Sequence, residues 1–228
     1  MTWTIDVGGQ QTTAAWDPPV SPPPTDDTVV FVCAHGAGGQ MNDRSMLTIR
    51  DLLTAEGLGI VRFNFLYRAK GSSRPDPMPR LQACWSAVVE RVRRELQPDR
   101  LILGGRSMGG RAASMLVADG ATCDGLLLLA YPLHPPGATD KLRADHLRAI
   151  TVPVLCFNGT RDAFCERPLM EAVVSKLGSN WHMHWIEGAD HGFHVLERSG
   201  RTGAQVMAEV AATTRDWLPV LLATRSSG

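Results

Sequence analysis

Short runs of consecutive apolar residues alternate along this chain with stretches in which apolar positions recur at helical spacing. The apolar runs predict strands covered on both faces, at residues 29–34, 59–67, 101–103, 125–131, 152–158 and 181–186. Helical spacing predicts helices at residues 43–56, 77–96, 111–118, 169–177 and 203–218, with a short helical stretch before Ile150. Regular alternation of strands and helices is typical of a mostly parallel sheet with helices on both faces.

The first residues of the chain follow a different pattern. Residues 2–17 alternate weakly between apolar and polar positions around Gly8-Gly9, which predicts a short opening hairpin. The run Pro18–Pro24 holds five prolines, and a segment so dense in proline fits neither a helix nor a sheet ladder. We expect an exposed extended connection there, in preference to a recognition segment for a proline-binding domain.

Composition narrows the classes of function. The chain has 228 residues, 44% of them hydrophobic, and its 23 basic and 23 acidic residues are interspersed. Length and content fit one globular domain over residues 1–228. Because the net charge is zero, the sequence shows no excess of basic residues that would favour binding to nucleic acid or to an anionic membrane. No apolar stretch is long enough to span a bilayer, and no leader pattern opens the sequence, so we expect a cytoplasmic protein.

The cysteines and histidines give little sign of a metal. Five cysteines are scattered without zinc-like spacing, which fits buried thiols in a reducing compartment. His182 and His184 would share one face of a strand, but no third ligand accompanies them. We therefore expect neither a metal nor a cofactor.

One turn carries the clearest chemical signal. The apolar run at 101–103 leads into Gly105-Arg-Ser-Met-Gly109, and a small-residue segment of helical character follows. A strand, a sharp Gly-x-Ser-x-Gly turn and a helix form a nucleophile elbow, in which a strained backbone lifts the serine hydroxyl out of the sheet. Ser107 is therefore the candidate nucleophile.

Further motifs extend this pattern into a resemblance to a known family. The elbow is accompanied by His35-Gly-Ala-Gly-Gly39, Gly159-Thr-Arg-Asp162 and Asp190-His-Gly-Phe193. With them the chain resembles the α/β-hydrolase superfamily over nearly its whole length, and within it the small, capless, dienelactone-hydrolase-like branch. The resemblance implies an α/β-hydrolase fold, a mostly parallel twisted sheet of about eight strands without a cap domain.

A narrower similarity rests on four segments. They are His35–Gly39, Arg62–Tyr67, Gly105–Arg111 and Tyr131–Gly137. These segments are similar to a bacterial group related to the testis-expressed and non-specific-lethal-complex hydrolase-like proteins. Dienelactone hydrolases themselves carry a cysteine nucleophile, so the serine at the elbow departs from their lactone chemistry.

Catalytic roles follow from chemistry and from the resemblance together. The superfamily order of serine, acid and histidine is met here by Ser107, Asp162 and His191. An imidazole suits the removal of the serine proton, and a carboxylate would orient that imidazole. Asp190 is the alternative orienter, but adjacent residues rarely present their side chains to each other. The backbone N–H groups of Met108 and Ala37 are the expected oxyanion donors.

Other residues are candidates for contact with a substrate. They are Gly36, Tyr67, Arg106 and His134. Arg106 could bind an anionic substrate group or pair with a nearby carboxylate, and His134 could line the site or be structural. His35 is expected to hold the glycine loop, His35–Gly39, by a hydrogen bond, in preference to a catalytic role. Arg62, on a central strand, would require a carboxylate partner.

The sequence therefore predicts a serine hydrolase that cleaves an ester or related acyl bond of a small substrate. A peptidase, thioesterase or acyltransferase could use the same three residues, and a non-catalytic interaction module is the alternative of another class. Only about twenty residues separate the strands that end near Tyr131 and begin near Val152. That is too short for a cap domain, so we expect a shallow site. No feature of the sequence specifies an oligomeric partner.

Overall fold

The computed structural model describes residues 1–22 and 27–223, in which eight strands form one sheet of order β1-β2-β4-β3-β5-β6-β7-β8. The strands are β1 (Thr2–Val7), β2 (Gln10–Asp17), β3 (Val29–Ala34), β4 (Gly59–Phe63), β5 (Arg100–Arg106), β6 (Gly125–Leu129), β7 (Val154–Gly159) and β8 (Trp181–Ile186). The opening hairpin β1–β2 is antiparallel and joins β4 antiparallel, whereas β3 to β8 run parallel. The predicted mostly parallel sheet and its hairpin are confirmed.

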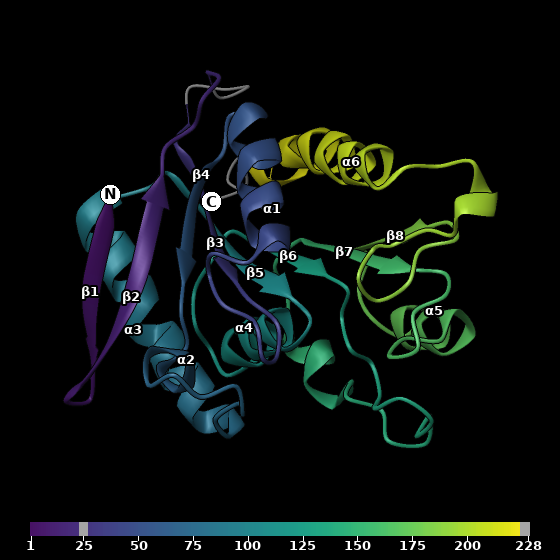
Figure 1. The fold of residues 1–228 in the computed structure, drawn as a ribbon, viewed down its shortest axis with the longest axis horizontal. Coiled ribbons are helices and arrows are strands. Elements are labelled where there is room, and N and C mark those ends of the chain that lie inside the picture. The colour runs from purple at the N-terminus through teal and green to yellow at the C-terminus, as the bar shows by residue number, and fades with distance from the viewer. Residues whose placement is uncertain (23–26, 224–228) are drawn as a thin grey trace.

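Helices cover both faces of this sheet (Figure 1). They are α1 (Arg44–Ala55), α2 (Leu66–Ala69), α3 (Met78–Leu96), α4 (Met108–Ala118), α5 (Arg167–Val174) and α6 (Gly203–Ala223), with 3-10 turns η1 (Asp145–Ala149) and η2 (Glu197–Ser199). Helices α1 and α6 lie on one face, and α3, α4 and α5 on the other. Successive strand residues pack into hydrophobic cores on opposite faces of the sheet. Phe31 belongs to the core beneath α1 and α6, and Val32 belongs to the core beneath α3 and α4. Burial on both faces explains the uninterrupted apolar runs.

Two element ends lie four or more residues from the sequence-based prediction. The strand expected at 59–67 ends at Phe63, because the N–H of Phe65 bonds to Nε2 of His35 at 3.3 Å and α2 then begins. The last helix continues past Pro219 to Ala223 instead of ending near Leu218. Leu218 and Leu221 are each 1% exposed, so the buried apolar face of α6 outweighs the hydrogen bond that proline omits.

The proline-rich connection falls partly within the described residues. Residues 18–22 belong to no helix or strand, and Val20 is 79% exposed. Pro23 and Pro24 lie outside the described residues.

The carboxyl ends of the parallel strands meet along one edge of the sheet, where ligands bind in such folds. Between β6 and β7 the chain forms only loop and the turn η1, so no cap domain covers this edge in the described part of the chain.

Candidate active site

The elbow after β5 has the backbone geometry that its sequence predicts. Ser107 adopts φ 47° and ψ −115°, a region that non-glycine residues rarely occupy, and its N–H donates to the carbonyl of Leu129 at 2.9 Å. A Cβ at Gly105 would lie 2.2 Å from the carbonyl oxygen of Ala34, and one at Gly109 would lie 2.5 Å from that of His35. The two glycines therefore let the turn and α4 sit directly against β3.

Ser107, His191 and Asp162 come together in one hydrogen-bonded chain. His191 Nε2 lies 2.8 Å from Ser107 Oγ, and its Nδ1 lies 2.9 and 2.8 Å from the two carboxylate oxygens of Asp162. A carboxylate accepts hydrogen bonds, so Nδ1 carries the ring proton and Nε2 is free to accept from the serine hydroxyl. The arrangement places a base within reach of a nucleophile and a carboxylate behind the base.

The Asp162 carboxylate is held from several sides. Its side chain is fully buried, one oxygen accepts from Asn158 Nδ2 at 3.0 Å, and the other accepts from the N–H of Phe164 at 2.8 Å. These two hydrogen bonds fix the position of the carboxylate. Asn158, at the end of β7, was not singled out from the sequence, because a polar residue in a buried strand does not reveal its partner.

Asp190 makes different contacts from those of an orienter. Its Oδ1 accepts from the N–H groups of Gly192 at 2.7 Å and His194 at 2.9 Å, which folds the loop that carries His191. The structure thus brings Asp162, and not Asp190, to the imidazole. Phe164 also packs on that imidazole, with ring centroids 4.3 Å apart, and no sequence signal identified this contact.

The two expected oxyanion donors come from different segments beside Ser107. Met108 opens α4, where the first-turn N–H groups have no intrahelical acceptor. Ala37 belongs to the loop after β3, and a Cβ at neighbouring Gly36 would lie 3.6 Å from Ser107 Cβ. The glycine loop therefore passes beside Ser107, and the donor roles of Ala37 and Met108 stay predictions.

His35 and His134 both have their ring nitrogens engaged by the backbone. In His35, Nδ1 donates to the carbonyl of Gly36 at 2.8 Å and Nε2 accepts from Phe65; burial lowers its pKa to about 4. In His134, Nδ1 donates to Pro135 at 3.0 Å and Nε2 accepts from the N–H of Glu166 at 3.2 Å. Each buried histidine fastens two segments together, and the ring nitrogens of His134 have none of their hydrogen-bonding capacity left for a substrate.

Tyr67 and Arg106, two of the candidates for substrate contact, both make contacts within the protein. Tyr67 is 3% exposed and packs edge-on against His35, and burial raises its pKa, so it supports the glycine loop from beneath. Arg106 forms no carboxylate pair within the described residues; its Nη2 donates to the carbonyl of His191 at 2.9 Å.

Two open questions about other polar residues are resolved. Arg62 pairs with Asp17 of β2, with both Nε and Nη2 at 2.9 Å from the same carboxylate oxygen. His184 Nε2 lies 2.7 Å from a carboxylate oxygen of Glu209, while His182 is exposed. Among residues 1–22 and 27–223 no three His, Cys, Asp or Glu side chains form a group that could hold a metal ion.

Comparison with known proteins places the chain in a family. Residues 27–219 match the family described as the alpha/beta hydrolase domain, so the chain belongs to it. The chain has the α/β-hydrolase fold, and no cap domain is present in the described residues. In the helices that the structure describes, no segment is long and apolar enough to cross a membrane.

Solved structures of low sequence identity share this fold. An a/b serine hydrolase without lid from Xanthomonas campestris is 22% identical, with TM-score 0.74 and 95% and 94% of the two chains covered. Est1E from Butyrivibrio proteoclasticus, solved with ferulic acid, is 16% identical, with TM-score 0.78 and coverage of 97% and 99%. Dienelactone hydrolase from Anabaena variabilis is 18% identical, with TM-score 0.71 and coverage of 95% and 95%.

Proposed function

We propose that this protein is a serine hydrolase that cleaves a carboxylic ester, or a closely related acyl bond, of a small substrate through an acyl-enzyme. The observation that carries the proposal is the 2.8 Å contact between Ser107 Oγ and His191 Nε2, with the other imidazole nitrogen on the buried carboxylate of Asp162. A serine hydroxyl becomes a useful nucleophile when a base takes its proton, and this geometry supplies that base.

In the first half of the reaction, Ser107 Oγ attacks the acyl carbon while His191 Nε2 takes its proton. Negative charge then develops on the former carbonyl oxygen, where the N–H groups of Met108 and Ala37 would donate hydrogen bonds. Protonated His191 gives its proton to the leaving alcohol as the tetrahedral intermediate collapses. The product of this half is an ester between the acyl group and Ser107.

In the second half, water takes the place of the alcohol. His191 removes a proton from the water as it attacks the acyl-enzyme, and returns that proton to Ser107 Oγ when the acid leaves. Asp162 stabilises the imidazolium formed in each half. The hydrogen bonds that it accepts from Asn158 and Phe164 keep it in place.

The related folds favour an ester over other acyl substrates. Est1E is described with bound ferulic acid, and the Xanthomonas protein is described as a serine hydrolase without lid. Thioesterases, peptidases and acyltransferases pass through the same acyl-enzyme and stay secondary candidates. A non-catalytic module would have no need for the complete chain of hydrogen bonds from Ser107 to Asp162.

Labelling by a fluorophosphonate probe tests the proposal, together with hydrolysis of p-nitrophenyl acetate. Both should be lost in Ser107→Ala, with the thermal midpoint nearly unchanged. Ser114→Ala is the matched control: Ser114 Oγ also lies 2.8 Å from a histidine, His146, but this serine is fully buried. Persistent labelling of Ser107→Ala would assign the reaction to another residue and overturn the proposal.

A further inference from the structure

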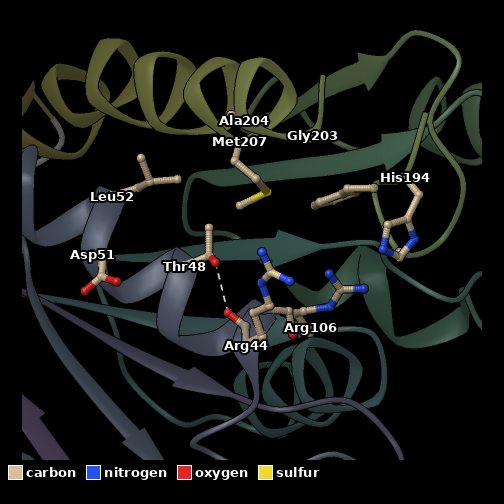
Figure 2. A pocket seen from close by; sticks show the side chains of 12 residues that line it. Arg44, Thr48, Asp51, Leu52, Arg106, His194, Gly203, Ala204 and Met207 are labelled. Carbon is tan, nitrogen blue, oxygen red and sulfur yellow. Dashed lines mark hydrogen bonds between the residues drawn. The ribbon is translucent and has the colours of Figure 1, made fainter. Parts of the chain in front are cut away.

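A cavity of about 800 Å³ opens between α1 and α6, on the face of the sheet away from α4 (Figure 2). Its volume lies within the range of small-molecule sites. Arg106, which precedes the nucleophile, and Gly192 and Phe193, which follow the catalytic histidine, form part of the wall. Ser107 and His191 themselves do not line it. The cavity therefore adjoins the acyl site without being part of it.

Two arginines give the cavity a positive wall. Arg106 donates one hydrogen bond, to the carbonyl of His191, and neither it nor Arg44 has a carboxylate partner within the described residues. Burial lowers the pKa of Arg106, while the charges of Asp162 and Asp190 act in the opposite direction without forming an ion pair with it. An anion that reached the free N–H groups of Arg106 would offset this loss of hydration.

The other charged groups of the wall already have partners. Asp51 accepts a hydrogen bond from Arg50 Nε at 2.8 Å, and His194 Nδ1 lies 3.4 Å from a carboxylate oxygen of Asp190. Two arginines thus lack a carboxylate while the acidic residue of the wall is occupied, which favours a ligand of negative charge.

Apart from Ser45 and Thr48, the rest of the wall is apolar. The apolar lining consists of Leu52 from α1, Ala204 and Met207 from α6, and Phe193. The guanidinium of Arg106 lies over the ring of Phe193, 5.3 Å from its centroid. Figure 2 shows Met207 on the α6 side and the two arginines on the wall below it. The cavity therefore offers a charged wall and a separate apolar wall to one occupant.

We infer that this cavity binds a small organic anion, a carboxylate or phosphate monoester with a short apolar body. The anionic group lies against Arg44 and Arg106, and the body packs on Leu52 and Met207. The assignment does not depend on the proposed hydrolase activity, since none of the three triad side chains lines the cavity.

Binding of hexanoate and of hexyl phosphate to the Ser107→Ala protein, measured by isothermal titration calorimetry, tests this assignment. Use of Ser107→Ala prevents turnover and separates the result from the fate of the proposed function. At least one of the two anions should bind, and their relative affinities identify carboxylate or phosphate as the preferred head group. The uncharged 1-hexanol should bind at least tenfold more weakly than the anion. Inorganic phosphate alone should also bind more weakly, because it lacks the apolar body.

Two further variants locate the ligand. Adding Arg44→Gln should weaken binding about tenfold or more, because a charge-assisted hydrogen bond is lost. Adding Met207→Trp should abolish binding by filling the apolar wall. Arg148→Gln is the matched control, since Arg148 is exposed, remote from this wall and without a side-chain partner among the described residues.

The assignment is overturned if neither anion binds. It is also overturned if 1-hexanol binds as tightly as the anions. If Arg44→Gln and Met207→Trp leave the affinity for the anion unchanged, the ligand lies in the acyl site and the assignment is again overturned.

Discussion

The guanidinium of Arg106 donates a 2.9 Å hydrogen bond to the main-chain carbonyl of His191. This bond joins the last residue of β5 to the loop after β8, and so ties the nucleophile elbow to the segment that carries the base. The same guanidinium lies over the ring of Phe193, two residues further along that loop. Arg106 therefore links the segments that carry Ser107 and His191, through the main chain of His191.

Replacement of this arginine should affect turnover more than substrate binding. Arg106→Met keeps a long apolar side chain but removes the donor, so the His191 loop loses a bond worth about 1.5–3 kcal/mol. We expect kcat for p-nitrophenyl acetate to fall about tenfold or more, with KM changed little. Steady-state kinetics checks this, with Arg148→Met as control. An unchanged kcat would show that the loop holds its position without Arg106.

The choice between two aspartates can be tested by their amides. Asp162→Asn would favour the wrong imidazole tautomer, and turnover should fall by roughly four orders of magnitude. Asp190→Asn keeps an oxygen that can accept from Gly192 and His194, so its loop should fold and turnover should fall far less. Measured kcat values decide between them, and the opposite ranking would make Asp190 the orienter.

The features predicted well from the sequence are those that local patterning determines. Burial of a strand on both faces requires an apolar residue at every position, so β3 and β6 were visible as runs. The elbow is visible because Gly105 and Gly109 lie two residues on either side of Ser107 and form a local pattern, although the atoms that require these glycines belong to Ala34 and His35.

The features that were missed depend on contacts between distant segments. The carboxylate partner of Arg62 is Asp17, brought near by antiparallel pairing of β2 with β4, which no local pattern reports. The end of β4 depends on a bond from Phe65 to His35, thirty residues earlier. His134 was left open between two roles, because only the fold shows that both of its ring nitrogens meet backbone atoms.

Two glycines near the nucleophile should respond differently to alanine. In Gly105→Ala the new methyl would lie 2.2 Å from the Ala34 carbonyl oxygen, at a φ of 128°, so unfolding free energy should fall by about 3 kcal/mol or more. In Gly36→Ala the methyl makes only ordinary contacts, the nearest at 3.6 Å from Ser107 Cβ, so stability should hold while kcat/KM falls.

Urea unfolding and ester kinetics on both variants check this contrast. Equal stability of the two would mean that β3 and β5 can separate to admit a methyl. Full activity of Gly36→Ala would mean that substrate does not approach Ser107 from the glycine loop.

Buried His35 should make stability depend on pH. Its folded-state pKa of about 4 lies below the ordinary value of 6.5, so the unfolded chain takes up a proton first as pH falls. Neutral His35 contributes its full stabilisation of the folded state above about pH 6.5. This contribution declines as pH falls from 6.5 to 4, and the total loss of unfolding free energy from a pKa shift of this size is about 3 kcal/mol. The physical cause is burial, which disfavours the charged imidazolium; protonated Nε2 could also no longer accept from Phe65.

His35→Gln provides the comparison, because glutamine can offer an oxygen to Phe65 but does not titrate. Urea unfolding at pH 7 and pH 4.5 should show the wild-type protein losing more stability than this variant. Other titrating groups, including half-buried His146, are shared by both proteins and cancel in the difference. Parallel losses in the two proteins would show that His35 is not the source.

The last prediction concerns the length of the acyl chain. In the described residues, no cap domain covers the carboxyl edge of the sheet. The loop after α2 reaches the glycine loop, because a Cβ at Gly38 would lie 3.8 Å from the carbonyl oxygen of Ser73. We therefore expect the rim of the acyl site to be shallow and to be built from the loops at residues 67–74 and 132–137.

A shallow rim buries few methylene groups, and each one left in water forgoes about 0.8 kcal/mol of binding. Activity on p-nitrophenyl esters should therefore peak at short acyl chains of about two to four carbons, without a jump at a lipid interface. A series of esters of increasing chain length measures this through kcat/KM. If efficiency instead rises through chains of about eight carbons and Met207→Trp abolishes the rise, the acyl chain enters the cavity beside α6, and the shallow-rim argument fails.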